Sequence, residues 1–146
     1  MSHVLGRLGR KPWTHRLEAH LFRPRILLAV AAPSVRRFLA GVLVDDGSEV
    51  IQIASGDALY DQLDPAAGSL EPALVIADVR LRGLSGLEIL CAIRSWGWTV
   101  PVILMTHNRD EEMSRLVRLA GRAYLFGAPL DIDDLRTAVV HCLARR

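Results

Sequence analysis

Residues 25–146 are predicted to form an α/β domain in which helices cover both faces of a parallel sheet. Short apolar runs of strand length alternate five times with segments of helical periodicity. These runs are almost continuously apolar, as in Ile26–Val30, which is typical of parallel strands that are buried on both faces. Five such units fit a flavodoxin-like (βα)5 doubly wound sheet with strand order 2-1-3-4-5.

Each strand and each of the first helices follows from its own pattern. The strands are expected at Ile26–Val30, Glu49–Ile53, Ala73–Ala77, Val100–Met105 and Ala123–Phe126. The apolar residues of the first helix recur at i, i+3, i+4, i+7 and i+8, which are Val35, Phe38, Leu39, Val42 and Leu43. A short second helix is marked by Ala58, Leu59 and Leu63 and is expected to end near Asp64-Pro65.

The later helices carry a start signal or an apolar face. Ser85 and Glu88 match a capping box that opens the third helix, with Leu87, Leu90 and Cys91 expected on its buried side. The fourth helix is marked by Met113, Leu116, Val117 and Ala120, and the last by Ile132, Leu135, Val139 and Leu143. Sites in such sheets lie at the carboxyl ends of the strands, near the change in strand order.

The first 24 residues are expected to form a basic N-terminal extension of this domain. Residues 1–25 carry six basic side chains and one acidic side chain, whereas the rest of the chain is net acidic. We interpret the extension as a solvated arm, and a docking or nucleic-acid-binding arm stays open as the less favoured alternative. No apolar run reaches the roughly 18 residues of a membrane span and no secretory signal is recognisable, so a cytoplasmic protein without membrane association is expected.

The two cysteines and two of the tryptophans are given structural roles. Cys91 and Cys142 lie in apolar helical patterns and are expected to be buried thiols, because their spacing matches no metal site. Trp96 and Trp98 follow the third helix and are expected to seal that end of the domain by packing. A role for them as an interface anchor stays open.

Four sequence blocks resemble, in order, the receiver domains of bacterial response regulators. The blocks are RILLAVAAPSVRRFLAGVLVDDGSEV, ALVIADVRLRGLSGLEIL, PVILMTHNRDEE and GRAYLFGAPLDIDDL, and they cover about residues 25–144. The resemblance implies a signalling domain of two-component phosphorelay systems rather than an enzyme. It also implies protein partners such as a sensor kinase or another regulator, and a homodimer through the fourth helix, fifth strand and fifth helix as one arrangement.

The resemblance places the family's phosphoacceptor at Asp78 and its switch hydroxyl at Thr106, and both residues are present. The acidic pair that binds Mg²⁺ together with the phosphoacceptor falls on Val30 and Ala31, which carry no carboxylate. Phosphoryl transfer depends on a metal and a cation to neutralise developing charge, so these two positions matter for the chemistry.

The remaining family positions lie around the end of the fifth strand. The lysine that contacts the phosphoryl group falls on Ala128, or on Gly127 with a one-residue shift, and is missing in either case. The aromatic switch position falls on Leu125 or Tyr124, and the bond between Ala128 and Pro129 is expected to be cis by the same resemblance.

These departures predict a degenerate member of the family. One carboxylate should bind Mg²⁺ poorly, because this ion needs several hard oxygen ligands. We therefore expect no cofactor, a lost Mg²⁺ site, and an Asp78 that is inactive or only weakly phosphorylated. The domain is predicted to be a pseudo-receiver that acts through protein–protein interaction. The alternative is a functional phospho-receiver that a histidine kinase phosphorylates on Asp78.

Two other interpretations of the sequence are set aside. Asp45 and Asp46 look like the family's acidic pair, but they follow the first helix and are assigned to a turn at the opposite end of the sheet from Asp78. An enzyme or a flavin carrier is disfavoured because no Gly-rich phosphate loop follows the first strand and no spacing typical of a catalytic triad or zinc protease occurs. His107 is interpreted as a solvated loop histidine.

Overall fold

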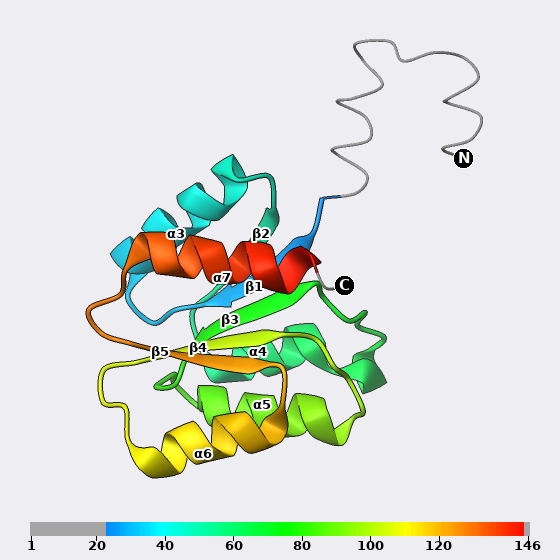
Figure 1. Ribbon diagram of the computed structural model, residues 1–146. Helices are drawn as coiled ribbons and strands as arrows, with labels where there is room; N and C mark the ends of the chain where they lie inside the picture. The colour runs from blue at the N-terminus through cyan, green and yellow to red at the C-terminus, as the bar shows by residue number, and fades with distance from the viewer. Residues whose placement is uncertain (1–22, 145–146) are drawn as a thin grey trace, which may run out of the picture.

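A five-stranded parallel sheet forms the centre of the molecule in the computed structural model, which describes residues 23–144 (Figure 1). The strands are β1 (Arg25–Ala29), β2 (Glu49–Ile53), β3 (Leu74–Asp78), β4 (Val102–Thr106) and β5 (Ala123–Gly127). The helices are α3 (Pro33–Asp45), α4 (Gly56–Leu63), α5 (Gly86–Ser95), α6 (Glu111–Ala120) and α7 (Ile132–Ala144), with a 3-10 turn at Pro65–Ala67.

The strand order is β2-β1-β3-β4-β5, and every neighbouring pair is parallel, as the sequence predicts. The order reverses between β1 and β3, because β1 pairs with β2 on one side and with β3 on the other. The chain therefore leaves β1 and β3 in opposite directions at the carboxyl edge of the sheet, where a crevice forms in folds of this kind. Asp78 is the last residue of β3 and lies at this edge.

Two apolar layers hold the helices to the sheet. Helices α3 and α7 cover one face and α4, α5 and α6 cover the other (Figure 1). Alternate residues of each strand point to opposite faces, so Ile26 and Leu28 pack under α3 and α7 while Leu27 and Ala29 pack against the other three helices. The central strands are consequently buried on both faces, which explains their almost continuous apolar sequence.

Local signals set the starts of the helices. Ser85 accepts a hydrogen bond from the Glu88 amide, and the Glu88 side chain accepts one from the Ser85 amide, so the predicted capping box is confirmed. Ser55 and Asp110 cap α4 and α6 in the same way with their side-chain oxygens. Pro33 opens α3, where its missing N–H costs no helical hydrogen bond.

The structure corrects two expectations about helix faces. Cys91 is exposed, so the prediction of two buried thiols is wrong for this residue and confirmed for Cys142. For the buried side of α5, the prediction is confirmed for Leu90, which is buried with Ile89 and Ile93, and Leu87 packs partly buried against the same core. Because α5 is apolar around most of its circumference, periodicity alone placed the buried face about one residue out of phase.

Helix α3 differs from its sequence pattern in a related way. Leu39 and Leu43 pack on the sheet, but Val35 and Phe38 are 44% and 59% exposed. The helix thus has a buried face and a second, solvent-facing apolar stripe. Trp96 and Trp98 do pack as predicted: the Trp96 ring contacts Trp98 at 5.4 Å and Tyr60 at 5.7 Å between centroids.

Residues 1–22, which hold most of the predicted basic extension, lie outside the described residues, so its boundary stays a prediction. Between residues 23 and 144, none of the helices is long and apolar enough to cross a membrane.

Candidate functional site

Asp78 is half-buried at the carboxyl edge, between the ends of β1 and β4. Its Oδ2 accepts a hydrogen bond of 2.9 Å from the Ala31 amide, which ties the β1–α3 loop to β3. Burial raises the pKa of this carboxyl group, and the effect outweighs the opposing influences of the Ala31 N–H and the positive charge of His107. Asp78 therefore has an environment that disfavours its ionised form.

The backbone around Asp78 is held by close packing and by hydrogen bonds. The Val79 amide donates to the Met105 carbonyl at 2.8 Å, and the Gly86 amide donates to the Val79 carbonyl at 2.9 Å. A Cβ at position 86 would lie 2.5 Å from the Asp78 carbonyl oxygen, so the start of α5 can approach β3 this closely only with glycine. The capping box at Ser85 therefore helps to position the candidate site.

The two positions predicted to hold the family's acidic pair bring no side-chain oxygen ligands to Asp78. Val30 is buried and apolar, and Ala31 offers its amide to the carboxylate instead. The carbonyl of Val30 accepts a 2.7 Å hydrogen bond from Arg36 on α3. In the part of the chain that the structure describes, no group of three or more His, Cys, Asp or Glu side chains is placed to hold a metal ion.

The segment after β5 is likewise apolar. Ala128 lies at the rim next to the cis bond to Pro129, which the resemblance predicted. Thr106, at the end of β4, accepts a hydrogen bond from the Asn108 amide at 3.2 Å. Tyr124 packs toward α7, where its ring lies 6.4 Å from that of His141, and Leu125 packs on the opposite face of the sheet.

A cavity of about 280 Å³ opens beside Asp78. It brings together the predicted residues Asp78, Thr106, Val30 and Ala128, with His107 at its edge. The structure adds wall residues that sequence reasoning missed, namely Val35, Met105, Phe126 and Leu130. These residues come from three separate segments, so only the strand order, and not any local pattern, could have grouped them.

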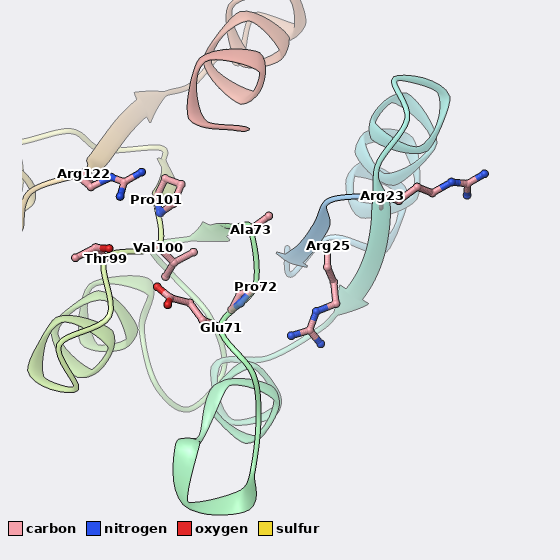
Figure 2. Close-up of a pocket in the computed structure, with 9 residues that line it drawn as sticks. All are labelled: Arg23, Arg25, Glu71, Pro72, Ala73, Thr99, Val100, Pro101 and Arg122. Atoms are coloured by element: carbon pink, nitrogen blue, oxygen red, sulfur yellow. The ribbon is translucent and has the colours of Figure 1, made fainter. Parts of the chain in front are cut away.

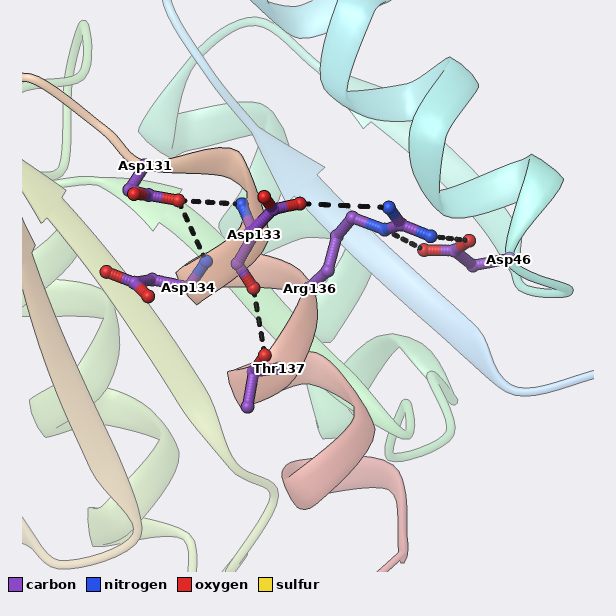
Figure 3. Close-up of polar contacts among 6 residues, drawn as sticks. All are labelled: Asp46, Asp131, Asp133, Asp134, Arg136 and Thr137. Atoms are coloured by element: carbon purple, nitrogen blue, oxygen red, sulfur yellow. Dashed lines mark hydrogen bonds and ion pairs between the residues drawn. The ribbon is translucent and has the colours of Figure 1, made fainter.

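The acidic turn after α3 takes no part in this site, as predicted. Asp46 follows the last residue of α3, and Gly47 has a φ of 104°, which glycine adopts without strain. Figure 3 shows the Asp46 carboxylate accepting two hydrogen bonds of 2.9 Å from Arg136 on α7, one from Nε and one from Nη2. Arg136 keeps the pKa of Asp46 below its usual range. No local pattern predicted this pair, because its members are 90 residues apart.

A second cavity, of about 470 Å³, lies at the opposite edge of the sheet (Figure 2). Arg23, Arg25 and Arg122 line it together with Glu71, but the three guanidinium groups point in different directions and share no common focus. Beside it, Arg94 donates four hydrogen bonds to the carbonyls of Gly121, Trp98 and Arg122. We assign a structural role to this edge.

The strand order 2-1-3-4-5, with helices on both faces and an aspartate at the carboxyl edge, defines an α/β domain with the CheY-like fold. The model of the response regulator receiver domain family matches residues 26–140. The chain belongs to this family.

Two curated relatives illustrate the range of similarity. Sporulation initiation phosphotransferase F of Bacillus subtilis is 28% identical over 119 residues, which cover 82% of this chain and 93% of the relative. Transcriptional regulatory protein FixJ of Azorhizobium caulinodans is 32% identical over 112 residues, which cover 77% of this chain and 51% of FixJ. The chain thus spans nearly the whole of one relative and about half of the other.

Solved structures show the same fold. A CheY-like receiver domain protein from Methanospirillum hungatei superimposes with a TM-score of 0.76 at 19% identity, covering 85% of this chain and 96% of that chain. The receiver domain of a LuxO repressor protein from Vibrio parahaemolyticus gives 0.75 at 22% identity, with coverages of 85% and 92%. The predicted fold class is confirmed.

Proposed function

We propose that this chain is a pseudo-receiver, which binds protein partners of a two-component system without Mg²⁺-dependent phosphorylation of Asp78. The observation that carries the proposal is the composition of the carboxyl edge. Asp78 is the one carboxylate among the described residues that line its cavity, and the resemblance assigns the family's acidic pair to Val30 and Ala31 and its lysine to Ala128.

The donor set does not fit Mg²⁺. This ion prefers six hard oxygen ligands and dehydrates reluctantly, so it is usually held by several carboxylates or phosphates. Here one oxygen of the single carboxylate already accepts a hydrogen bond from Ala31. A phosphoryl group on Asp78 would also meet apolar walls where the family has a cation. Loss of one electrostatic stabiliser typically costs about 10²–10³ in rate, and here both the metal and the lysine position are affected.

The test is phosphorylation of the full chain by acetyl phosphate with Mg²⁺, followed by intact mass spectrometry, and binding of beryllofluoride followed by NMR. No adduct on Asp78 is expected. The triple variant Val30→Asp, Ala31→Asp, Ala128→Lys is the matched positive control, since it restores the two carboxylates and the ammonium group. An adduct on the unmodified chain at a rate close to that of the triple variant would establish the alternative, a working phospho-receiver.

A homodimer through α6, β5 and α7 is the second part of the proposal. Leu116 and Leu119 form an apolar patch on the outer side of α6, where they are 41% and 71% exposed. Sedimentation equilibrium should show a dimer that Leu119→Arg weakens. Leu70→Arg is the control, because Leu70 is 77% exposed in a loop away from this face. A chain that remains monomeric at high concentration would contradict the arrangement.

A further inference from the structure

The cavity beside Asp78 has a chemical character of its own. Its volume of about 280 Å³ suits a small group rather than a large cofactor. The walls are mainly apolar and come from the residue after β1, the start of α3, the end of β4, β5 and the segment after it: Val30, Val35, Met105, Phe126, Pro129 and Leu130. A ligand that fills this space must therefore present a largely apolar body.

Asp78, the carboxylate that lines the cavity, is an acceptor with unused capacity. One oxygen of Asp78 accepts the Ala31 N–H, and the other has no hydrogen-bond donor within residues 23–144. None of the ion pairs of this region involves Asp78, and neither Arg80 nor Arg82 pairs with it. A half-buried carboxylate that has one unbonded oxygen and no ion pair favours a ligand that brings a positive charge and an N–H donor.

Nearby cations are engaged elsewhere. Arg36 donates to the Val30 carbonyl, and Arg109 donates to the Leu125 carbonyl at 2.7 Å, so neither guanidinium turns to the carboxylate. His107 lies at the rim and is exposed. His107 is the one basic side chain among the described residues that line the cavity, and it forms neither a hydrogen bond nor an ion pair with Asp78.

We propose that this cavity binds a primary ammonium group carried on a short apolar stem, which is either a free amine or a lysine side chain of a protein partner. The ammonium group donates to the free oxygen of Asp78, and the stem packs against Phe126, Val35 and Leu130. The inference rests on the proposed function, because a phosphorylated or metal-bound Asp78 would not accept this ligand.

The test is titration of the full chain with n-butylammonium chloride, followed through the amide resonances of Ala31 and Gly127 in ¹⁵N NMR spectra. We expect a saturable shift that n-butanol does not reproduce at equal concentration. Asp78→Asn should weaken the binding by about tenfold or more, since the charge-assisted hydrogen bond is lost. Absence of a saturable shift, or equal affinity of Asp78→Asn, overturns the proposal.

A variant that supplies the ammonium group from within the chain gives an independent check. Ala128 lines the cavity, so the side chain of an Ala128→Lys variant can reach Asp78 and should reduce the affinity for n-butylammonium by about tenfold. Ala67→Lys adds the same charge at an exposed position of the 3-10 turn and should leave the affinity unchanged. Equal effects of both variants would mean that general charge repulsion, and not the cavity, controls binding.

The two sources of the ammonium group are separated with Nα-acetyl-lysine N-methylamide. Binding as tight as that of n-butylammonium shows that the cavity admits a lysine with its backbone attached, which supports a protein partner. Binding of n-butylammonium alone supports a free amine. The acetyl phosphate assay tests the proposed function separately. If Asp78 forms an adduct and the chain also binds the amine, only the proposed function is refuted. If Asp78 forms no adduct and the chain does not bind the amine, only this inference is refuted.

Discussion

Asp78 and Arg94 are half-buried charges at opposite edges of the same sheet. Burial raises the pKa of Asp78 and lowers the pKa of Arg94, so both environments disfavour the charged form. Their partners differ: Arg94 donates four hydrogen bonds to backbone carbonyls, whereas Asp78 accepts one from a backbone amide. The guanidinium of Arg94 is used in holding three backbone carbonyls, whereas Asp78 keeps one carboxylate oxygen available to a ligand.

The largest effect is expected at Arg94. Arg94→Ala leaves the carbonyls of Gly121, Trp98 and Arg122 without this donor and should lower the free energy of unfolding by about 2 kcal/mol, because hydrogen bonds to charged groups are among the stronger ones. Urea unfolding monitored by circular dichroism measures the change in the free energy of unfolding. Arg115→Ala is the control, since Arg115 makes only an exposed pair with Glu112 at 3.5 Å. Equal losses of stability in the two variants would show that the backbone hydrogen bonds of Arg94 contribute no more than an exposed ion pair does.

Asp78→Asn tests the other side of the comparison. A carboxyl group whose pKa is raised on folding contributes stability at low pH, and this contribution is lost as pH rises through the folded-state pKa. At neutral pH the neutral amide should therefore be the more stable form, by less than about 1 kcal/mol after solvent screening. The gain should vanish in acid, below the usual aspartate pKa of about 3.9.

Thermal unfolding of Asp78→Asn and of the unmodified chain between pH 3 and pH 8 gives the measurement. Asp61→Asn is the charge-matched control, because Asp61 is exposed on α4. If Asp78→Asn were instead less stable than the unmodified chain at neutral pH, the ionised carboxylate would be stabilising. Its hydrogen bond from the Ala31 amide would then outweigh the cost of burying the charge.

The smallest effect is expected for Arg136→Gln, which removes the ion pair with Asp46. The pair is exposed and solvent screens it, so its contribution should decrease further in high salt. Because the pKa of Asp46 is lowered, the contribution is present above the usual aspartate pKa and is lost as pH falls through the lowered value. A double-mutant cycle with Asp46→Asn isolates the pair, and a coupling that does not respond to salt would contradict this account.

The sequence predicted the features that local patterns encode. The strand positions, the capping box at Ser85 and the turn at Asp46 follow from periodicity and short-range hydrogen bonding, and the strand order followed from fitting five such units to a doubly wound sheet. Three features join residues that are distant in the chain and therefore depend on how the layers of the fold pack together. They are the cavity, the carbonyl partners of Arg94 and the ion pair between Arg136 and Asp46. Cys91 was misplaced because α5 is apolar on several sides and its phase was ambiguous.

Helix α3 connects the cavity to the outside of the molecule. Val35 lines the cavity and is also exposed, and Phe38, one turn further along, is exposed over more than half its surface. A macromolecule that covers both residues removes a continuous apolar surface from water, and this gives its association a negative heat-capacity change. A small amine confined to the cavity covers much less. Calorimetry over a range of temperatures would thus distinguish a partner seated on α3 from a ligand held only at Asp78.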